Sequence, residues 1–138
     1  MDETRHYLSF RVGQLWYGVD VANVIEVLHM LALTEVPAAE TRISGLMTLR
    51  DKVMPVIDLR RHFGLPEPQF HLDTPVIAVR IAQRMAALVV DEVDNVERVT
   101  ADQLTAYDGP HIAQVSGVAR TPERLLLLID MEAIDTQA

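Results

Sequence analysis

The sequence contains no cysteine, which excludes disulfide bonds and metal sites built on thiolates. Lysine and arginine number only 12 against 20 aspartates and glutamates, for a net charge of −8, so nucleic acid is not expected as a partner. The longest uninterrupted apolar runs, such as Met85–Val90, are far too short to span a bilayer. Because the first ten residues carry no apolar signal core, we expect a cytoplasmic protein without direct membrane insertion.

Motifs that carry catalysis or bind cofactors are missing as well. The five histidines are scattered, the six glycines are isolated, and no serine stands in a nucleophile elbow. The acidic run from Asp91 to Glu97 has valine where a calcium loop needs an oxygen ligand and a glycine. This run is better interpreted as a capped turn with a solvated acidic face. We therefore predict no enzyme activity, no metal and no cofactor.

The chain does contain an internal repeat. Residues 43–59, ISGLMTLRDKVMPVIDL, align without a gap under residues 115–131, VSGVARTPERLLLLIDM. Charges and turn residues recur in step with apolar residues, which implies two copies of one small structural unit. With 49% apolar residues in 138, the chain can bury the core of one domain. We predict lobes at about 6–66 and 76–134, joined by a linker near 66–74.

Short alternating segments and tight turns predict an all-β fold. Leu8, Phe10 and Val12 alternate with more polar neighbours, as in a half-buried strand. Gly13-Gln14 suits a hairpin turn, and a second hairpin is predicted around Asp51-Lys52, whereas residues 31–42 are expected to form a loop. Four aspartates follow predicted strands and are expected to cap short helical turns: Asp20, Asp58, Asp91 and Asp130. Each copy is therefore predicted to form a small β-barrel with short helical turns. The last of these turns is expected to be a short C-terminal helix.

Positions at which the two copies differ are not required by the barrel and become candidates for function. Arg50 is replaced by Pro122 in the second copy, and Glu26 by Arg98. Both side chains are placed to be exposed on a strand face, and an ordinary surface charge is an equally good interpretation. Trp16, the single tryptophan, belongs either to a second core or to an exposed contact.

Several of these segments resemble the CheW-like domain family of bacterial chemosensory arrays. The central block, L-R-x-x-V-x-P-V-I-D-L-R-x-x-F-G-L, is specific, and the resemblance runs from about Arg5 to Ile134. It is carried by these segments: Tyr17–Asp20, Val24–Val27, Ile43–Leu65, Leu88–Val93, Ser116-Gly117 and Leu126–Ile129. The resemblance implies two SH3-like barrels that are intertwined, so that lobe borders need not follow the sequence halves.

The resemblance also implies a function and the residues that carry it. A CheW-like domain is a non-catalytic adaptor between the cytoplasmic tips of methyl-accepting chemoreceptors and the regulatory domain of a CheA-type histidine kinase. The receptor-facing positions match Val24, Glu26, Gly45 and Arg50. Asp51 stands where the family usually has glycine, and we expect it to pair with Arg50 and join the receptor surface. The expected kinase contacts lie in a segment shorter than the family's usual one: Thr105, Tyr107, Pro110 and Ile112.

The sequence is compatible with three functions. The chain is either a general adaptor, a paralogue that binds one partner as a decoy or localisation factor, or a specialised adaptor for pilus motility or surface sensing. A kinase regulatory domain cut from a longer chain is less expected, given the Met1 start and the end after the last predicted helix.

Overall fold

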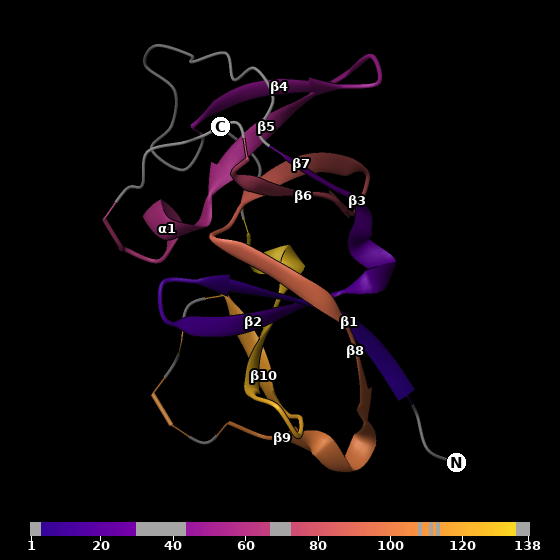
Figure 1. Ribbon diagram of the computed structural model, residues 1–138, viewed down its shortest axis with the longest axis vertical. Coiled ribbons are helices and arrows are strands. Elements are labelled where there is room, and N and C mark those ends of the chain that lie inside the picture. The colour runs from indigo at the N-terminus through magenta and orange to yellow at the C-terminus, as the bar shows by residue number, and fades with distance from the viewer. Residues whose placement is uncertain are drawn as a thin grey trace.

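The computed structural model describes residues 4–29, 44–66, 73–107, 109–110, 112 and 114–134. In these ranges the chain forms short strands and helical turns arranged as two lobes (Figure 1). The strands are β1 Thr4–Val12, β2 Leu15–Asp20, β3 Val24–His29, β4 Gly45–Leu49, β5 Lys52–Asp58, β6 Pro75–Ile81, β7 Arg84–Val89, β8 Glu92–Thr100, β9 Leu104–Thr105, β10 Val115–Arg120 and β11 Leu125–Ile129. The helical turns are η1 Val21–Asn23, α1 Leu59–His62, η2 Ala101–Gln103 and η3 Met131–Ala133.

The predicted all-β fold of two small SH3-like lobes is confirmed. The predicted loop at 31–42 and the linker residues 67–72 lie outside the described residues. None of the helices within the described ranges is long and apolar enough to cross a membrane.

The two sheets exchange strands between the two copies of the repeat. Sheet A has the strand order β8-β1-β2-β11-β10-β9, and sheet B has the order β3-β6-β7-β5-β4. The first hairpin of each copy therefore lies in the sheet of the other copy, where its second strand pairs in parallel with β11 or β5. Neither 6–66 nor 76–134 contains a complete sheet, because β1 and β2 belong to sheet A and β6 and β7 belong to sheet B. The borders of the sheets do not follow the sequence halves.

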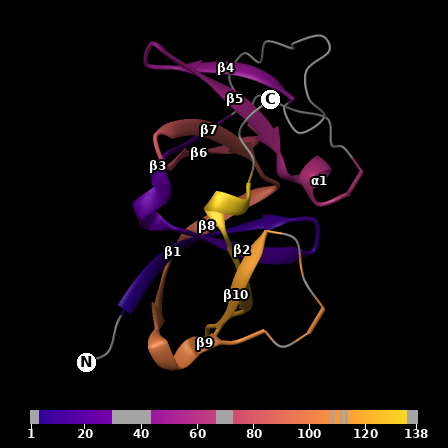
Figure 2. The same cartoon turned by 180° about the vertical axis from the view of Figure 1, so that it is seen from behind.

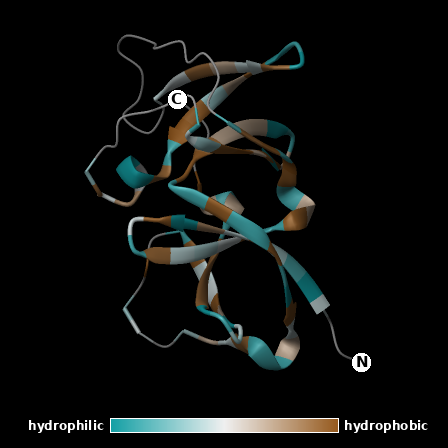
Figure 3. Ribbon diagram, in the orientation of Figure 1, coloured by the Kyte–Doolittle hydropathy of each residue, from teal (hydrophilic) through white to brown (hydrophobic). Residues whose placement is uncertain are grey.

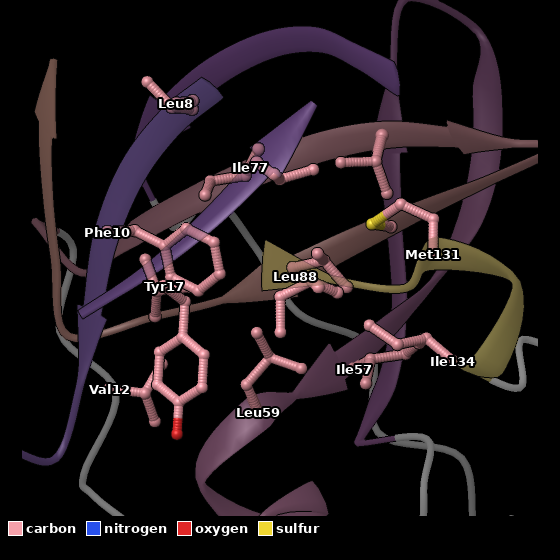
Figure 4. Packing of buried hydrophobic residues seen from close by; sticks show 14 of the residues in the cluster. Leu8, Phe10, Val12, Tyr17, Ile57, Leu59, Ile77, Leu88, Met131 and Ile134 are labelled. Carbon is pink, nitrogen blue, oxygen red and sulfur yellow. The ribbon is translucent and has the colours of Figure 1, made fainter. Parts of the chain in front are cut away.

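The largest apolar cluster joins the two sheets. Side chains of β1 alternate, so that Leu8, Phe10 and Val12 enter this cluster while Tyr7 enters another. Strand β6 contributes Ile77 and Val79 from the opposite sheet, as Figure 4 shows for Ile77. Since β1, β2, β6 and β7 are buried on both faces, the lobes share one continuous core rather than touching at their surfaces.

Each lobe also has an apolar interior of its own. The interior of the sheet B lobe is lined by methionine and small aliphatic residues: Met47, Met54, Val56, Val76, Ala78, Ala87 and Val89. The sheet A lobe contains larger and more rigid side chains: Tyr7, Val99, Ala119, Leu126 and Leu128, with Trp16 packed against them. The flexible thioethers of methionine fill irregular space more readily than aromatic rings do.

Three of the four predicted aspartate caps are confirmed. Asp20, Asp58 and Asp130 each accept a hydrogen bond from the backbone N–H two residues on, and so begin η1, α1 and η3. Figure 2 shows η3, in yellow, between the two lobes. There Met131 joins the core shared by the sheets.

The prediction for Asp91 was wrong. The chain continues from Asp91 directly into β8, so that the acidic run forms a strand rather than a capped turn, and Glu97 is only 7% exposed. The carboxylate of Asp91 instead accepts from the backbone N–H of Gly13 at 2.6 Å and from Nε of Arg60 at 2.9 Å. It thereby connects the β1–β2 turn of sheet A to the helix that follows β5 of sheet B.

Candidate partner-binding surface

An ion pair joins the two outer strands of sheet B. Arg50 Nη2 lies 2.8 Å from Glu26 Oε1, although β3 and β4 stand at opposite ends of the strand order. The sheet must therefore curl until its edges meet. The predicted pairing of Arg50 with Asp51 was wrong, because the guanidinium reaches across to β3 instead.

Exposure separates the two partners of this pair. The Arg50 side chain is 74% exposed, whereas that of Glu26 is 31% exposed. An ion pair open to this extent stabilises a fold by only about 0–1 kcal/mol. The guanidinium of Arg50 is accessible to another protein, whereas the Glu26 oxygen that faces it is buried.

The turn that carries Arg50 has an uncommon backbone. Arg50 and Asp51 have φ of 50° and 69°, the pattern of a type I′ hairpin turn, which favours glycine or asparagine. The turn thus begins one residue earlier than predicted, and β5 starts at Lys52. Left-handed conformations cost about 1–2 kcal/mol for residues with a Cβ, so this turn holds Arg50 in a strained but defined position.

The other predicted receptor residues lie at different depths and distances. Val24 is half-buried and packs against the core shared by the sheets. Gly45 is buried at the start of β4, about 17 Å along the strand from Arg50 at 3.4 Å per residue. The structure therefore brings Glu26, Arg50 and Asp51 together and leaves Gly45 at the far end of the same strand.

Two exposed valines were not predicted as site residues: Val53 follows the charged turn on β5, and Val27 follows Glu26 on β3 with its side chain on the other face of that strand. Val27 on β3 is 43% exposed, and Val53 on β5 is 65% exposed. Figure 3 shows the β4–β5 turn as a hydrophilic tip on a hairpin with hydrophobic segments. The repeat gives no indication that Val27 is exposed, because Val99, the corresponding residue 72 positions later, is fully buried.

The sheet A lobe is closed by a comparable but more buried arrangement. Arg124, just before β11, lies 2.8 Å from Asp94 and 3.7 Å from Glu97, both on β8. Its guanidinium also stacks over Trp16, 3.9 Å from the ring centroid. Trp16 was predicted to belong either to a second core or to an exposed contact. Each prediction is correct in part, because Trp16 packs on the core inside the lobe and also contacts Arg124. We assign this group to stability, since Arg124 is 20% and Glu97 7% exposed.

The predicted kinase contacts lie on the segment before β10. Thr105 ends the two-residue strand β9 and is exposed, as are Tyr107 and Pro110. Ile112 is half-buried, and its carbonyl accepts from the backbone N–H of Val115 at 3.2 Å. The segment thus presents exposed side chains beside the edge of sheet A.

We next considered metal binding and ionisable groups among the described residues. Among the described residues, no group of three histidine, aspartate or glutamate side chains could hold a metal ion. Burial raises the pKa of the Tyr17 phenol above its ordinary value, but Tyr17 is a core residue stacked between Phe10 and Phe63. The arrangement of charges and valines suits recognition of another protein.

Comparisons with known proteins identify relatives of this chain. The model of the CheW-like domain family matches residues 6–137. Chemotaxis protein CheW of Klebsiella aerogenes is 30% identical over 136 residues, which cover 94% of this chain and 81% of that protein. Protein FrzA of Myxococcus xanthus is 33% identical over 95 residues, covering 69% and 59% respectively. The crystal structure of scaffolding protein TtCheW from Thermoanaerobacter tengcongensis superposes with a TM-score of 0.84 at 28% identity, over 92% of this chain and 89% of that one.

Proposed function

This chain belongs to the CheW-like domain family, and from that premise we propose that it is a non-catalytic cytoplasmic adaptor in a chemosensory array. It couples the cytoplasmic tips of chemoreceptors to the regulatory domain of a CheA-type histidine kinase. Relatives named for chemotaxis, and a relative described as a scaffolding protein, support this assignment. The observation that carries it is the exposed Arg50, held by its ion pair with Glu26 and followed on β5 by the exposed Val53.

On the receptor side, the charged turn and Val53 act together. An apolar stretch of the receptor tip packs on Val53, and its charged side chains pair with Arg50 or Glu26. Charge pairing of this kind sets register and specificity more than raw affinity. Asp51, adjacent to the pair and exposed, selects among tips by attracting or repelling their charges.

On the kinase side, the segment before β10 is the proposed contact. Thr105, Tyr107 and Pro110 are exposed there, and the aromatic ring of Tyr107 offers the amphipathic surface that is enriched at protein interfaces. This contact lies on the sheet A lobe, whereas the receptor contact lies on the sheet B lobe. The two partners therefore bind without competing for one surface.

A binding titration tests the adaptor role directly. The full chain is titrated against a receptor cytoplasmic tip and against a kinase regulatory domain from the same genome, and then against both together. Binding to each, with a joint complex, is the expected result. Binding to one partner alone overturns the coupling role and favours the decoy or localisation alternative.

A single substitution tests the receptor surface. Arg50→Ala should weaken binding of the receptor tip by about tenfold, as expected for the loss of a charged contact at the centre of an interface. Arg84→Ala, which removes an exposed arginine from the β6–β7 hairpin of the same lobe, is the matched control and should leave binding unchanged. Equal losses from both variants would show that the tip senses only overall charge.

A further inference from the structure

A groove runs along sheet A and extends to η1 and η3 between the lobes, and neither Arg50 nor Glu26 lines it. It consists of two cavities of about 260 and 290 Å³ that share Arg5, Tyr7, Ser116 and Leu128. Tyr7 and Leu128 also belong to the apolar cluster inside the sheet A lobe. The exposed lining is mixed polar and apolar in the larger cavity and mostly polar in the smaller one.

Gly117 leaves open space in the larger of the two cavities. A Cβ placed on Gly117 would meet no atom within 4 Å, whereas one on Gly18 would lie 3.2 Å from Leu128 and Tyr7. Gly117 has no left-handed φ, so its missing side chain is not needed for the backbone conformation. The space above it remains available to a side chain from another molecule.

The walls of the groove combine apolar surface with an unpaired strand edge. Leu104 and Thr105 of β9 line the larger cavity, and Leu104 is 38% exposed. Within the described residues β9 is the outermost strand of sheet A and pairs only with β10. An incoming extended segment could thus contact both an apolar side chain and backbone groups at this edge.

The rim carries an excess of negative charge. Asp20, Asp130 and Glu132 line the smaller cavity, with Arg5 as its only cationic side chain. Asp20 ends β2 and Asp130 directly follows its parallel neighbour β11, which places both residues at the same end of sheet A. With a chain that is also acidic overall, at −8, this rim favours a cationic occupant.

We propose that this groove binds a segment of a protein partner that carries an apolar side chain next to a lysine or arginine. The apolar side chain lies over Gly117 and against Leu128, and the basic side chain reaches toward Glu132 at the rim. The site goes beyond the adaptor function, since of the four predicted kinase contacts only Thr105 lines it. It does not involve the Arg50 surface.

A labelled peptide tests the chemistry of the occupant. A six-residue peptide of alternating lysine and valine is titrated against the full chain by fluorescence anisotropy, in parallel with the same peptide carrying glutamate in place of lysine. We expect saturable binding of the lysine peptide and at least about tenfold weaker binding of the glutamate peptide, a difference of about 1.4 kcal/mol. No saturable binding, or equal binding of the two peptides, overturns the proposal.

Variants of the groove then test whether the peptide binds in it. Gly117→Phe fills the empty space and should weaken binding about tenfold or more, while Gly117→Ala, the matched control, stays within about twofold of wild type. Glu132→Gln should weaken it about two- to fivefold, as expected for an exposed ion pair. If Gly117→Phe lowers the thermal midpoint, Thr105→Arg blocks the exposed wall instead, with the same expected loss. Unchanged affinity in the blocked variant would mean that the peptide binds elsewhere on the acidic surface, which overturns the proposal.

Discussion

Arg50 and Glu26 close the sheet B lobe by an ion pair of 2.8 Å between strands that share no backbone ladder in the described part of the chain. In the sheet A lobe, Arg124 makes the corresponding closure to Asp94 and Glu97 on β8. Each lobe thus has an arginine–carboxylate ion pair between segments that are not hydrogen-bonded neighbours in the sheet, and the pair is more buried in the sheet A lobe. The buried version is suited to stability, and the exposed version to recognition.

Exchanging the charges of the exposed pair separates its two roles. The double variant Glu26→Arg, Arg50→Glu restores an ion pair of reversed direction, so the free energy of unfolding should stay within about 1 kcal/mol of wild type. Binding of the receptor tip should still be lost, because each charge now faces the wrong partner group. Urea denaturation and the titration described above measure the two effects. Recovery of receptor binding in the double variant would mean that the pair acts only through the fold.

Removing Arg124 should have the opposite profile. Arg124→Ala leaves Glu97 as a nearly buried carboxylate and removes the stacking on Trp16, so we expect a loss of about 2–4 kcal/mol in the free energy of unfolding. Adding Glu97→Gln should recover part of this loss, because a neutral amide is easier to bury than a charge. Arg50→Ala, measured in parallel by urea denaturation, should lose less than about 1 kcal/mol. Similar losses for the two arginines would contradict the assignment of their roles.

Asp51 offers a test of the strained turn. Asp51→Gly should raise the free energy of unfolding by about 0.5–1 kcal/mol, because glycine adopts φ of 69° without strain. Asp51→Val should lower it by about 1–2 kcal/mol, since a branched side chain resists that conformation. Both values follow from thermal or urea unfolding. If Asp51→Gly binds receptor tips with unchanged affinity and selectivity, Asp51 is a turn residue and not a receptor contact.

The exchange of strands between the copies predicts that the two halves fold only together. A protease site placed within 67–72 and then cut should leave a nicked protein that elutes as one species, because sheets A and B each contain strands from both halves. Size-exclusion chromatography checks this. Either fragment alone, purified under denaturing conditions and refolded, should show no cooperative unfolding by circular dichroism. Two halves that separate after cutting would contradict the exchange.

Stability at alkaline pH should depend on Tyr17. Burial raises its pKa above the ordinary value of 10.0, so the unfolded chain ionises at lower pH than the folded one. The stabilisation is complete below about pH 10 and is lost as pH rises through the folded-state pKa. Tyr17→Phe should therefore lose less stability between about pH 9 and 11.5 than wild type, measured by urea denaturation. Tyr107→Phe, at an exposed position, should follow the wild-type curve.

Local signals in the sequence predicted the element order well. The alternation of Leu8, Phe10 and Val12 placed a strand, and Asp58 and Asp130 followed their strands as caps, because these features depend on neighbours within a few residues. Asp91 looked the same locally, but its partner Gly13 lies 78 residues away. No periodicity records such a contact.

Contacts between distant segments account for most of what the sequence could not predict. A repeat is compatible with two separate barrels or with exchanged hairpins, and only the family resemblance favoured the second. Arg50 and Glu26 were singled out by their differences from Pro122 and Arg98, but their direct pairing depends on how far sheet B curls. The groove over Gly117 was missed because an empty position has no sequence signal of its own.

The exchanged hairpins also determine how the molecule responds to force. Motion of one lobe against the other must disrupt the apolar core that the two sheets share, and each sheet contains strands from both copies of the repeat. We therefore expect a force applied at the Arg50 turn to displace the two lobes together. In the proposed adaptor, this rigid connection would transmit a small shift at one partner surface to the other.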